Sequence, residues 1–463
     1  MIGFSEGFHD AAISVVKNGR ITYASHAERY SRKKHDKRLT AEQATLALEL
    51  NGDDTIAFYE KTGFLKRSRQ WFAGQFDTAK KERVLALKPT VNHYHHLSHA
   101  AAAFQTSKYD EAACVVVDSI GEWDTASIWK AKYENGVAKY YKKWNMCYPR
   151  SIGLWYSALT DYVGLKPLDE EYIFMGMSAF GKPCHTKRLR RQLWANNHKG
   201  IRRPINGDHV DIAASAQVVL EEELSKIFKI ALKFSDNICY GGGVALNCVA
   251  NSKLQVQCDD NLWIMPNPGD AGGSLGAALL SYGKRVPFSP YLGYNIEKPC
   301  DPKEVVEEIL KTGLAGVANG RAEFGPRALG NRSLLADPRK MENKRRVNDI
   351  KKRQRFRPFA PAILEEHAVD YFDMPRQSRH MSYVYSAKRG SAIPACIHVD
   401  NTARVQTVPK ISSSVIRPIL ECWYERTGCP VLLNTSLNIR GMPMVNTIDD
   451  AVAFSTKYDV RVF

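Results

Sequence analysis

The sequence has no long hydrophobic run and no paired-cysteine motif. Nowhere in its 463 residues does a stretch approach the roughly 18 consecutive apolar residues of a membrane span. The first residues have neither the basic nor the long apolar segment of a secretory signal. The ten cysteines are scattered, and none has the Cys-x-x-Cys spacing of many zinc sites. We therefore expect a cytoplasmic protein with reduced thiols and no membrane-inserted segment.

Acidic residues are few relative to basic ones. The chain has 65 lysines and arginines against 49 acidic residues, a net charge of +16. Basic residues cluster at 29–38, 61–69, 187–203 and 339–357. Such clusters attract polyanions through phosphate contacts and counterion release, or they form a solvated basic surface. The third cluster also carries Trp194, which suits either base stacking or an amphipathic surface helix.

Two strand–turn–strand units suggest an internal duplication. In the first, apolar runs flank an Asn-Gly turn at 17–19, which predicts a hairpin. In the second, an apolar strand at 114–117 ends at Asp118 and precedes a strand near 125–129, with another Asn-Gly turn at 134–136. An acidic residue at each unit favours a duplicated actin-like fold, in which phosphates lie between two halves. Two unrelated hairpins remain the alternative on periodicity alone.

Two glycine-rich turns follow in the middle of the chain. A predicted strand at 237–240 enters the turn at 241–243, and a predicted helix at 245–254 leaves it. A second turn at 268–273 precedes a predicted helix at 275–282. A strand, a glycine turn and a helix in this order can hold nucleotide phosphates on backbone N–H groups.

Four prolines within 287–302 predict a domain boundary there. We accordingly divide the chain into a domain over residues 1–290 and a second domain over residues 291–463. The predicted helix at 213–234 belongs to the first of them, because its apolar residues recur with helical spacing.

Histidines and carboxylates form a candidate metal site. His95 and His99 are four residues apart before an alanine run, so a helix would place both imidazoles on one face. Asp118 and Asp270 could complete the site. Nitrogen and oxygen ligands without thiolate suit iron, manganese or zinc. His9, beside Asp10, is a candidate base for removing a proton from an alcohol; the alternative is a turn histidine held by Asp10.

The segment 320–339 has an unusual composition. It contains four arginines, three glycines and two prolines in 20 residues. It matches neither a core helix nor an alternating strand. Each arginine offers a planar fork of donors that fits phosphate or carboxylate. The alternative interpretation is a basic surface loop.

This segment resembles the signature of the ATP-dependent O-carbamoyltransferase family, which includes the nodulation, cephamycin and tobramycin carbamoyltransferases. The resemblance runs along nearly the whole chain. In chain order, the other motifs are His9-Asp10, residues 28–36, His95-His96-Leu97-Ser98-His99, and residues 175–183, 241–247, 269–273, 357–361 and 434–438.

The resemblance implies an α/β protein of two domains. The N-terminal one would be actin-like, a duplicated ribonuclease H-like domain that binds metal and transfers the carbamoyl group. The smaller C-terminal one would be YrdC-like and would form carbamoyl adenylate from carbamoyl phosphate and ATP with Mg²⁺. It also implies that the transfer domain holds a divalent metal, usually iron, with manganese or zinc as alternatives. A homodimer is compatible with it.

The resemblance assigns roles to particular residues of this chain. His9, Asp10 and Arg327 would be catalytic, and His95, His99, Asp118 and Asp270 would bind the metal. The residues expected to bind ATP or carbamoyl adenylate are Gly242, Gly243, Asn247, Gly272, Gly273, Lys351, Arg353, Arg357, Arg404, Ser436 and Asn438. Lys351 to Arg353 and Ser436 to Asn438 match the Lys-x-Arg and Ser-x-Asn pairs of the YrdC-like module.

The chain departs from the family in being shorter, in having Ile173 in place of a usual lysine, and in having Gln354 in place of a usual glutamate. Neither the motifs nor the resemblance identifies the molecule that carries the acceptor hydroxyl. The net charge motivates the hypothesis that it is the 5-hydroxymethyl group of a modified cytosine in DNA, flipped out or single-stranded. A sugar or natural-product hydroxyl is the alternative. Other classes are a tRNA threonylcarbamoyl-type synthase, an actin-like phosphotransferase and, least favoured, a non-catalytic binding protein.

Overall fold

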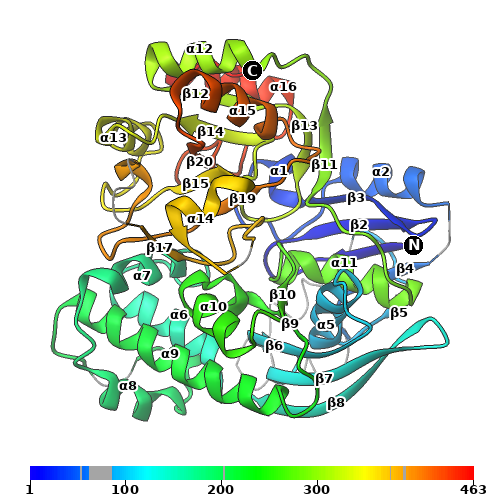
Figure 1. The fold of residues 1–463 in the computed structure, drawn as a ribbon. Helices are drawn as coiled ribbons and strands as arrows, with labels where there is room; N and C mark the ends of the chain where they lie inside the picture. Colours follow the sequence, from blue (N-terminus) through cyan, green and yellow to red (C-terminus); the bar gives the residue numbers. More distant parts are fainter. Residues whose placement is uncertain (53–54, 62–85, 202–203, 376, 389–392) are drawn as a thin grey trace. The chain divides into compact units, whose positions relative to one another are not determined.

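The computed structural model describes residues 1–52, 55–61, 86–201, 204–375, 377–388 and 393–463 (Figure 1). Most of the basic cluster at 61–69, and Arg202 and Arg203 of the third cluster, lie outside the described residues. The described chain forms two compact units. One contains Met1–Ala27 and His35–Phe288, and the other contains Glu28–Lys34 and Ser289–Phe463.

Two of the properties predicted from composition can be compared with the structure. All ten cysteines are free thiols. Among the helices of the described residues, none combines the length and the apolar character needed to cross a membrane.

The first unit contains two five-stranded sheets of the same topology, counted over the described residues. In each, three strands form an antiparallel meander. A fourth strand pairs in parallel with the first strand of the meander, and a fifth strand pairs in parallel with the fourth. The first sheet has the order β3-β2-β1-β4-β5, with β1 Ile2–Ser5, β2 Ala12–Lys17, β3 Arg20–His26, β4 Ile56–Phe58 and β5 Val91–Asn92. The second has the order β8-β7-β6-β9-β10, with β6 Glu111–Gly121, β7 Asp124–Glu134, β8 Val137–Cys147, β9 Ile238–Gly241 and β10 Leu262–Ile264. This repeat confirms the predicted duplicated ribonuclease H-like fold.

Helices α5 (His95–Gln105) and α11 (Asp270–Tyr282) pack against each other within this unit. Helix α11 contacts β1 and β2 of the first sheet, whereas α5 contacts β6 and β9 of the second. Small residues allow this approach: a Cβ atom on Gly276 would lie 1.8 Å from the carbonyl oxygen of Ser98. The helix pair therefore brings groups from both sheets close to one another.

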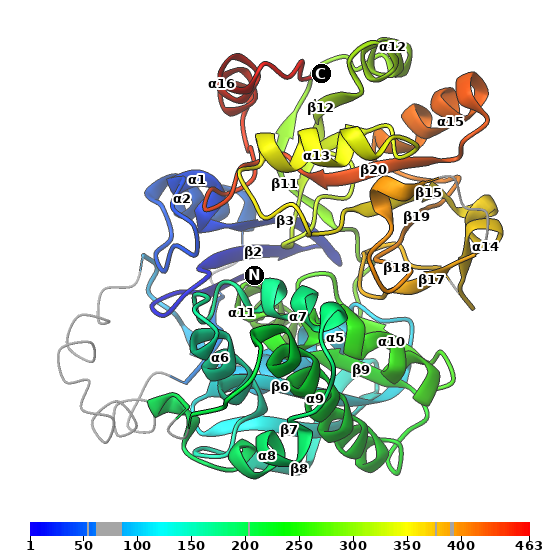
Figure 2. The ribbon, with the colours of Figure 1, turned by 90° about the vertical axis from the view of Figure 1, so that its left-hand side faces the viewer.

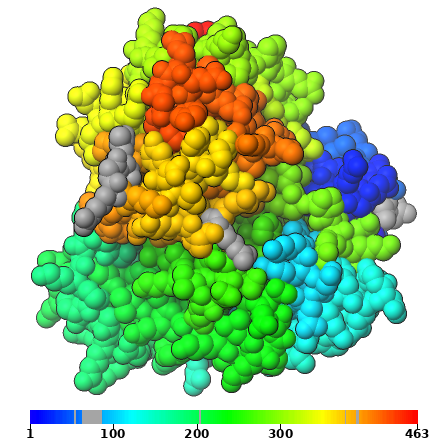
Figure 3. All heavy atoms as spheres, viewed as in Figure 1, coloured from blue at the N-terminus to red at the C-terminus, as the bar shows by residue number. Residues whose placement is uncertain are grey.

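The remaining helices of the first unit gather mainly on the second sheet. Helices α6 and α9 contact β6, and α7, α8 and α10 contact α9 (Figure 2). Their bounds are α6 Ile152–Tyr162, α7 Glu171–Met177, α8 Thr186–Leu193, α9 His209–Ala231 and α10 Cys248–Gln257, while α2 Ala41–Asn51 contacts the first sheet. In the space-filling view this helical layer is green, and the cyan surface beside it belongs to the meander of the second sheet (Figure 3).

Local signals predicted several of these elements correctly. The Asn-Gly turns join β2 to β3 and β7 to β8, and the asparagine and the glycine of both turns have positive φ. The helix expected from residue 245 begins instead at Cys248, because Asn247 caps it after a short 3-10 turn. Helix α11 begins at Asp270, five residues before the predicted start, so the second glycine turn is partly helical.

The second unit is the smaller α/β unit that was predicted. Its main sheet has the order β12-β14-β20-β15-β19, with β12 Leu314–Ala318, β14 Arg332–Ala336, β20 Val431–Ser436, β15 Ala360–Leu364 and β19 Gln406–Val408. Helices α12 (Pro302–Thr312) and α15 (Ile416–Thr427) pack on it, and Trp423 is fully buried in the shared core. The other elements are β11 Tyr291–Ile296, β13 Gly320–Glu323, α13 Met341–Ile350, α14 Ala368–Tyr371, β16 Phe372–Asp373, β17 Tyr385–Ala387, β18 Thr402–Ala403 and α16 Ile448–Tyr458.

Residues 28–34, close to the N-terminus, belong to this second unit. They include most of α1 (Ala27–Ser31). The buried Arg29 donates to the carbonyl oxygens of Glu323 and Gly325, and Arg32 pairs with Asp450 at 3.3 Å. These contacts attach a short N-terminal segment to a unit that otherwise begins at residue 289.

Candidate active site

Two imidazoles and two carboxylates converge in the first unit. His95 and His99 lie one turn apart on α5, and their Nε2 atoms are 3.0 Å apart. Asp118 Oδ2 lies 3.1 Å from Nε2 of His95 and 3.4 Å from Nε2 of His99. Asp270 Oδ1 lies 3.4 and 3.5 Å from the same two atoms. The structure thus brings together the four residues predicted as metal ligands, and all four are buried.

Each carboxylate is held by a different element. Asp118 lies where the pairing of β6 with β7 is irregular, and its Oδ1 accepts hydrogen bonds from the N–H groups of Ser119 and Gly243. Its Oδ2 is therefore the oxygen that faces the imidazoles. Asp270 is the first residue of α11, where the helix dipole favours a negative charge.

Two further acids surround His95. Glu122 accepts from the backbone N–H of His95, and Glu60 Oε2 lies 3.8 Å from the Nδ1 atom of His95. Both acids are buried. Neither was predicted from the sequence, because their spacing from His95 follows no recognised motif.

The buried imidazoles and carboxylates shift one another's pKa values. Burial alone raises the pKa of the Asp118 carboxyl, but hydrogen bonds from His95 and His99 hold it well below its usual range. Burial lowers the pKa of His95, but Asp270 and Asp118 raise it well above its usual value. Burial also lowers the pKa of His99, but hydrogen bonds to the same two carboxylates raise it above its usual value. The donor atoms lie within 4.8 Å of one another, an arrangement that a divalent cation fits.

His9 lies next to this cluster, in the loop that joins β1 to β2. Its Nδ1 is 2.9 Å from Asp10 Oδ2, and its Nε2 is 3.6 Å from Asp270 Oδ2. Burial lowers the pKa of His9, but the charges of Asp270 and Asp10 raise it to about 9. The sequence-predicted pair His9 and Asp10 is therefore adjacent to the four predicted ligands.

Glycines of the first turn permit close backbone packing. Gly242 has a φ of +88°, and a Cβ atom there would lie 2.3 Å from the carbonyl oxygen of Val117. Gly243 donates its N–H to Asp118 at 3.3 Å. These glycines therefore hold the turn against β6, and their expected contact with nucleotide stays a prediction.

Glycines of the second turn have a similar packing role. A Cβ atom on Gly272 would lie 1.8 Å from the carbonyl oxygen of Asn267, and one on Gly273 would lie 2.7 Å from the Tyr59 ring. Because both glycines lie in the first turn of α11, they let this helix approach its neighbours closely.

Asn247 is committed to contacts within the protein. Its Oδ1 accepts from the N–H of Ala250, which caps α10, and its amide nitrogen donates to Gln217. A nucleotide contact by this side chain would have to compete with both hydrogen bonds.

In the second unit, Lys351 joins the predicted Ser-x-Asn pair. Its ammonium group donates to the Ser436 hydroxyl at 3.3 Å and to the Asn438 side-chain oxygen at 2.9 Å, and also to the carbonyl oxygens of both residues. Lys351 is only 4% exposed. Burial, together with the charges of Arg353 and Arg357, holds its pKa well below the usual lysine value.

The predicted arginines of this unit differ in their surroundings. Arg353 donates through Nε to Asn348 at 2.7 Å, and its guanidinium lies 3.9 Å from the centre of the Phe359 ring. Arg357 is close enough to Lys351 to lower its pKa. Arg404, between β18 and β19, has a buried Nε without a hydrogen-bond partner among the described residues.

The segment 320–339 differs from its prediction. It contains β13 and β14 rather than only irregular chain. Arg332 is fully buried, and burial lowers its pKa to about 10. Arg321 donates to backbone carbonyls, and Arg339 pairs with Asp337 at 2.9 Å. The carbonyl partners of Arg332 are those of Asn319, Gly320, Asn331, Tyr294 and Asn446.

Arg321, Arg332 and Arg339 therefore all use guanidinium donors on partners within the protein. A guanidinium fits backbone carbonyls as well as it fits phosphate, and composition cannot distinguish the two uses. Arg327 lies in the loop between β13 and β14, and its catalytic role stays a prediction.

Two residues that were not singled out from the sequence complete a hydrogen-bonded chain with His9 and Asp10. His35 Nδ1 lies 2.7 Å from Asp10 Oδ1, and His35 Nε2 lies 2.8 Å from Asp169 Oδ1. No spacing rule connects positions 35 and 169. His35 belongs to a motif of the family resemblance, but nothing in that motif indicated its partners.

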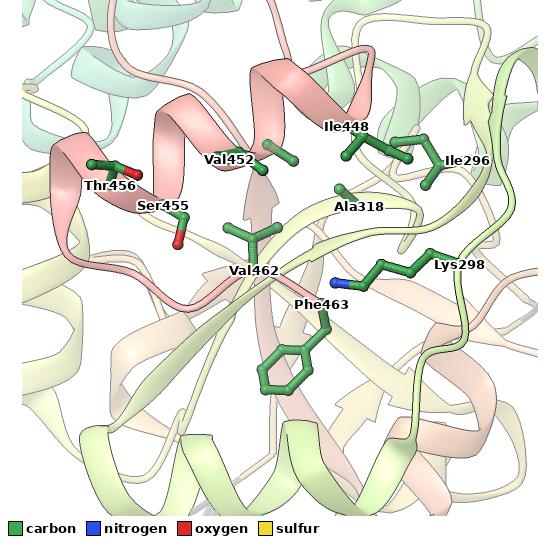
Figure 4. Close-up of a pocket in the computed structure, with 10 residues that line it drawn as sticks. Ile296, Lys298, Ala318, Ile448, Val452, Ser455, Thr456, Val462 and Phe463 are labelled. Carbon is green, nitrogen blue, oxygen red and sulfur yellow. The ribbon is translucent and has the colours of Figure 1, made fainter.

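A cavity of about 120 Å³ in the second unit lies apart from the predicted residues (Figure 4). Its walls are mainly apolar, and the Lys298 side chain extends toward Val462 and Phe463. The helix α16 contributes Ile448 and Val452 to the lining. We assign no chemistry to this cavity.

The fold and the cluster together define an α/β protein whose duplicated N-terminal unit holds a buried imidazole–carboxylate site. A family model described as the carbamoyltransferase N-terminus matches residues 77–203 and 190–279. Another, described as the carbamoyltransferase C-terminus, matches residues 306–463. The uncharacterized protein sll1178 of Synechocystis sp. is 31% identical over 97% of this chain and 93% of its own length. The nodulation protein NolNO of Sinorhizobium fredii is 30% identical over 96% of this chain and 76% of its own length.

The chain belongs to the carbamoyltransferase family, and it is accordingly a transferase. Among solved structures, full-length HypF in its phosphate- and nucleotide-bound form is 14% identical, with a TM-score of 0.38, and the match covers 60% of this chain and 54% of that one.

Proposed function

We propose that this carbamoyltransferase is ATP-dependent and transfers the carbamoyl group to a hydroxyl oxygen. Activation would take place in the second unit and transfer in the first. The observation that carries the proposal is the position of His9, whose Nε2 is 3.6 Å from one of four converging ligand residues. A base beside a cation-binding cluster is suited to acyl transfer.

Activation consumes carbamoyl phosphate, ATP and one water. Water cleaves the carbamoyl–phosphate bond and releases phosphate, and the carbamate oxygen then attacks the α-phosphorus of ATP and expels pyrophosphate. The product is carbamoyl adenylate. Both substrates are multiply anionic, so the reaction needs fixed cations, and we assign this role to Lys351, Arg353 and Arg357 of a YrdC-like module. Ser436 and Asn438 orient Lys351, and Arg404 adds a further charge at the same module.

Transfer forms a carbamate ester and releases AMP. His9 takes the proton of the acceptor hydroxyl while the oxygen attacks the carbamoyl carbon, and AMP leaves as the carbon–oxygen bond to its phosphate breaks. Asp10 holds Nδ1 of His9, so that Nε2 is the atom that accepts the proton. Arg327 is proposed to stabilise the negative charge that develops.

His95, His99, Asp118 and Asp270 would hold a divalent cation, since two nitrogen and two oxygen donors converge on one point. When bound, the cation would supply Lewis-acid stabilisation of the carbonyl oxygen. This donor set suits iron, which we propose first, as well as manganese or zinc. Gly242, Gly243, Gly272, Gly273 and Asn247 are proposed to lie around the nucleotide, and Mg²⁺ to accompany ATP.

The acceptor is the open part of the proposal. Helix α8 buries Leu189 and Leu193 and is basic elsewhere, while Trp194 after it is 41% exposed. Together with the net charge of +16, this basic surface motivates 5-hydroxymethylcytosine in DNA as an acceptor to be tested beside sugars. Binding of DNA should weaken with salt and with charge reversal at Lys187 and Arg190, the second of which pairs with Glu222. DNA binding that is absent at low salt excludes this acceptor.

The experiment that tests the reaction follows nucleotide release. The protein is incubated with ATP, carbamoyl phosphate and a divalent metal, and pyrophosphate, AMP and ADP are separated by chromatography. We expect pyrophosphate that depends on carbamoyl phosphate, and AMP that depends on an acceptor from a panel of sugars and hydroxymethylated DNA. Release of ADP instead would favour an actin-like phosphotransferase, and a requirement for threonine and bicarbonate would favour a threonylcarbamoyl-type synthase.

A matched pair of lysine variants locates the activation step. Lys351→Met should strongly reduce pyrophosphate release, whereas Lys352→Met should retain it, because Lys351 is buried and its neighbour is exposed. Equal activity of the two variants would contradict the assignment of activation to this site.

A further inference from the structure

The side chain of His35 is held between two carboxylates. Its Nδ1 is 2.7 Å from Asp10 Oδ1, and its Nε2 is 2.8 Å from Asp169 Oδ1. Asp10 uses its other oxygen for Nδ1 of His9 at 2.9 Å. The result is a continuous chain of hydrogen bonds from Asp169 through His35 and Asp10 to His9, all within the first unit.

The chemistry of the carboxylates determines which atoms donate in this chain. Burial raises the pKa of Asp10, but hydrogen bonds from His35 and His9 hold it well below its usual range. The hydrogen bond from His35 likewise lowers the pKa of Asp169. Ionised carboxylates can only accept hydrogen bonds, so both ring nitrogens of His35 donate. His9 must also donate from Nδ1, which directs its Nε2 away from Asp10.

The backbone holds the two central groups in an unusual conformation. Asp10 has a φ of +51° and His35 a φ of +53°, both in the left-handed region that is strained for a residue with a side chain. The N–H of Gly7 donates to the carbonyl of Lys37, and that of Ala11 to the carbonyl of Asp36. Two loops are thus tied together at the point where Asp10 meets His35.

We propose that His35 and Asp169 are positioning residues that fix the direction of the His9 ring through Asp10. The inference rests on the proposed role of His9 as the base. Without His35, Asp10 would lose the partner of one oxygen and could rotate away from Nδ1 of His9. The ring would then no longer present Nε2 to the acceptor hydroxyl, and a displacement of about 1 Å lowers a rate by up to roughly a hundredfold.

Two substitutions of His35 distinguish its hydrogen bond to Asp10 from its hydrogen bond to Asp169. The side-chain amide of Asn reaches the place of an imidazole Nδ1, whereas that of Gln reaches the place of Nε2. His35→Asn should therefore keep the hydrogen bond to Asp10, and His35→Gln should keep only the one to Asp169. We expect His35→Gln to lower kcat of transfer about ten- to hundredfold and His35→Asn to retain most of it.

The decisive measurement is the NMR signal of the His9 Nδ1 proton in protein labelled with ¹⁵N-histidine. It is assigned by its loss in His9→Gln. A strong hydrogen bond to Asp10 should shift this proton downfield in the wild type and in His35→Asn, and the shift should be lost in His35→Gln. A merely structural role predicts that the two variants behave alike, which would overturn the inference.

Asp169 provides a second test that does not depend on the folding of His35 variants. Asp169→Asn should weaken the His9 signal, whereas Lys166→Met should leave it unchanged. The second variant removes only the outer ion pair of Asp169, at 2.8 Å, from a lysine side chain that is 69% exposed. A His9 signal that is unaffected by Asp169→Asn would also overturn the inference.

The two proposals can fail separately, because the NMR signal is read on the resting protein without substrates. A wild-type protein that responds in the NMR experiment but releases no pyrophosphate would contradict the proposed function alone. Transfer that is seen in the wild type and unchanged in His35→Gln would contradict the positioning role alone.

Discussion

The candidate sites of the two units are both buried, but they hold opposite charges. In the first unit, the carboxylates of Asp118 and Asp270 lie against imidazoles, with Glu60 and Glu122 nearby. In the second, the partners of Lys351 are hydroxyl, amide and carbonyl oxygens, and the charged groups that shift its pKa are both arginines.

This difference indicates what each site can bind. Buried carboxylates and imidazole lone pairs that converge on one point are stabilised by a cation. A buried ammonium with cationic neighbours is stabilised by an anion such as a phosphate group, because the oxygens that accept its hydrogen bonds here are neutral. These surroundings support the proposed cation site in the first unit and the proposed anion site in the second, and they suit a reaction that separates phosphate chemistry from carbonyl transfer.

Substitution of His99 is expected to have the largest effect on the difference between the two sites. His99→Ala should lower metal content and reduce transfer about a thousandfold, since loss of a Lewis acid removes several kcal/mol of stabilisation. Pyrophosphate release should be retained. Metal is measured by elemental analysis, with His209→Gln, an exposed histidine on α9, as control. Equal loss of both activities would show that the two sites are not separate in function.

A reciprocal effect is expected at Lys351. Lys351→Met should reduce carbamoyl-phosphate-dependent pyrophosphate release about a hundred- to a thousandfold, the usual result of removing one fixed electrostatic group. Binding of a divalent metal, measured by titration calorimetry, should not change. A variant that loses metal as well would indicate that the substitution disturbs the whole chain.

Arg332 is a buried cation of the second unit to which we assign a structural role, in contrast to Lys351. Arg332→Met leaves several buried carbonyl oxygens without donors, at about 1–3 kcal/mol each, so we expect a loss of at least about 3 kcal/mol in the free energy of unfolding. Arg461→Gln, which removes an exposed pair with Glu304, should cost less than about 1 kcal/mol. Urea denaturation measures both, and similar values would contradict the structural role of Arg332.

The smallest expected effect is a shift in pH dependence. Because the pKa of Lys351 is lowered, its charge is lost as pH rises through a value below that of an ordinary lysine, and kcat/KM for pyrophosphate release should fall there. Arg353→Gln removes a positive neighbour, so the pKa of Lys351 should rise and the fall should move to higher pH. A shift to lower pH would have the wrong sign for this assignment.

Local features of the chain were predictable from the sequence. Asn18-Gly19 and Asn135-Gly136 have the backbone freedom that tight hairpin turns require, so the hairpins could be located without the fold. The four-residue spacing of His95 and His99 likewise defines a common helix face before any tertiary contact is known. The motif resemblance then named Asp118 and Asp270 as their partners.

Other features depended on surroundings that spacing does not reveal. Asn247 matched a nucleotide motif, yet both ends of its amide are used within the protein, at Ala250 and Gln217. Arg332 matched a phosphate-binding composition, yet it binds backbone carbonyls. In both cases the residue type allows more than one use, and the structure shows partners within the protein that the motif did not indicate.

The sequence by itself determined the hairpins, the helix face of the two histidines, the order of the two units and the family. These depend on interactions between near neighbours or on the order of motifs. Only the tertiary structure decided that His35 joins Asp10 to Asp169, 134 residues farther along the chain. The physical reason is that a hydrogen bond between distant residues requires the loops that carry them to be placed together, and the packing of the whole unit determines that placement.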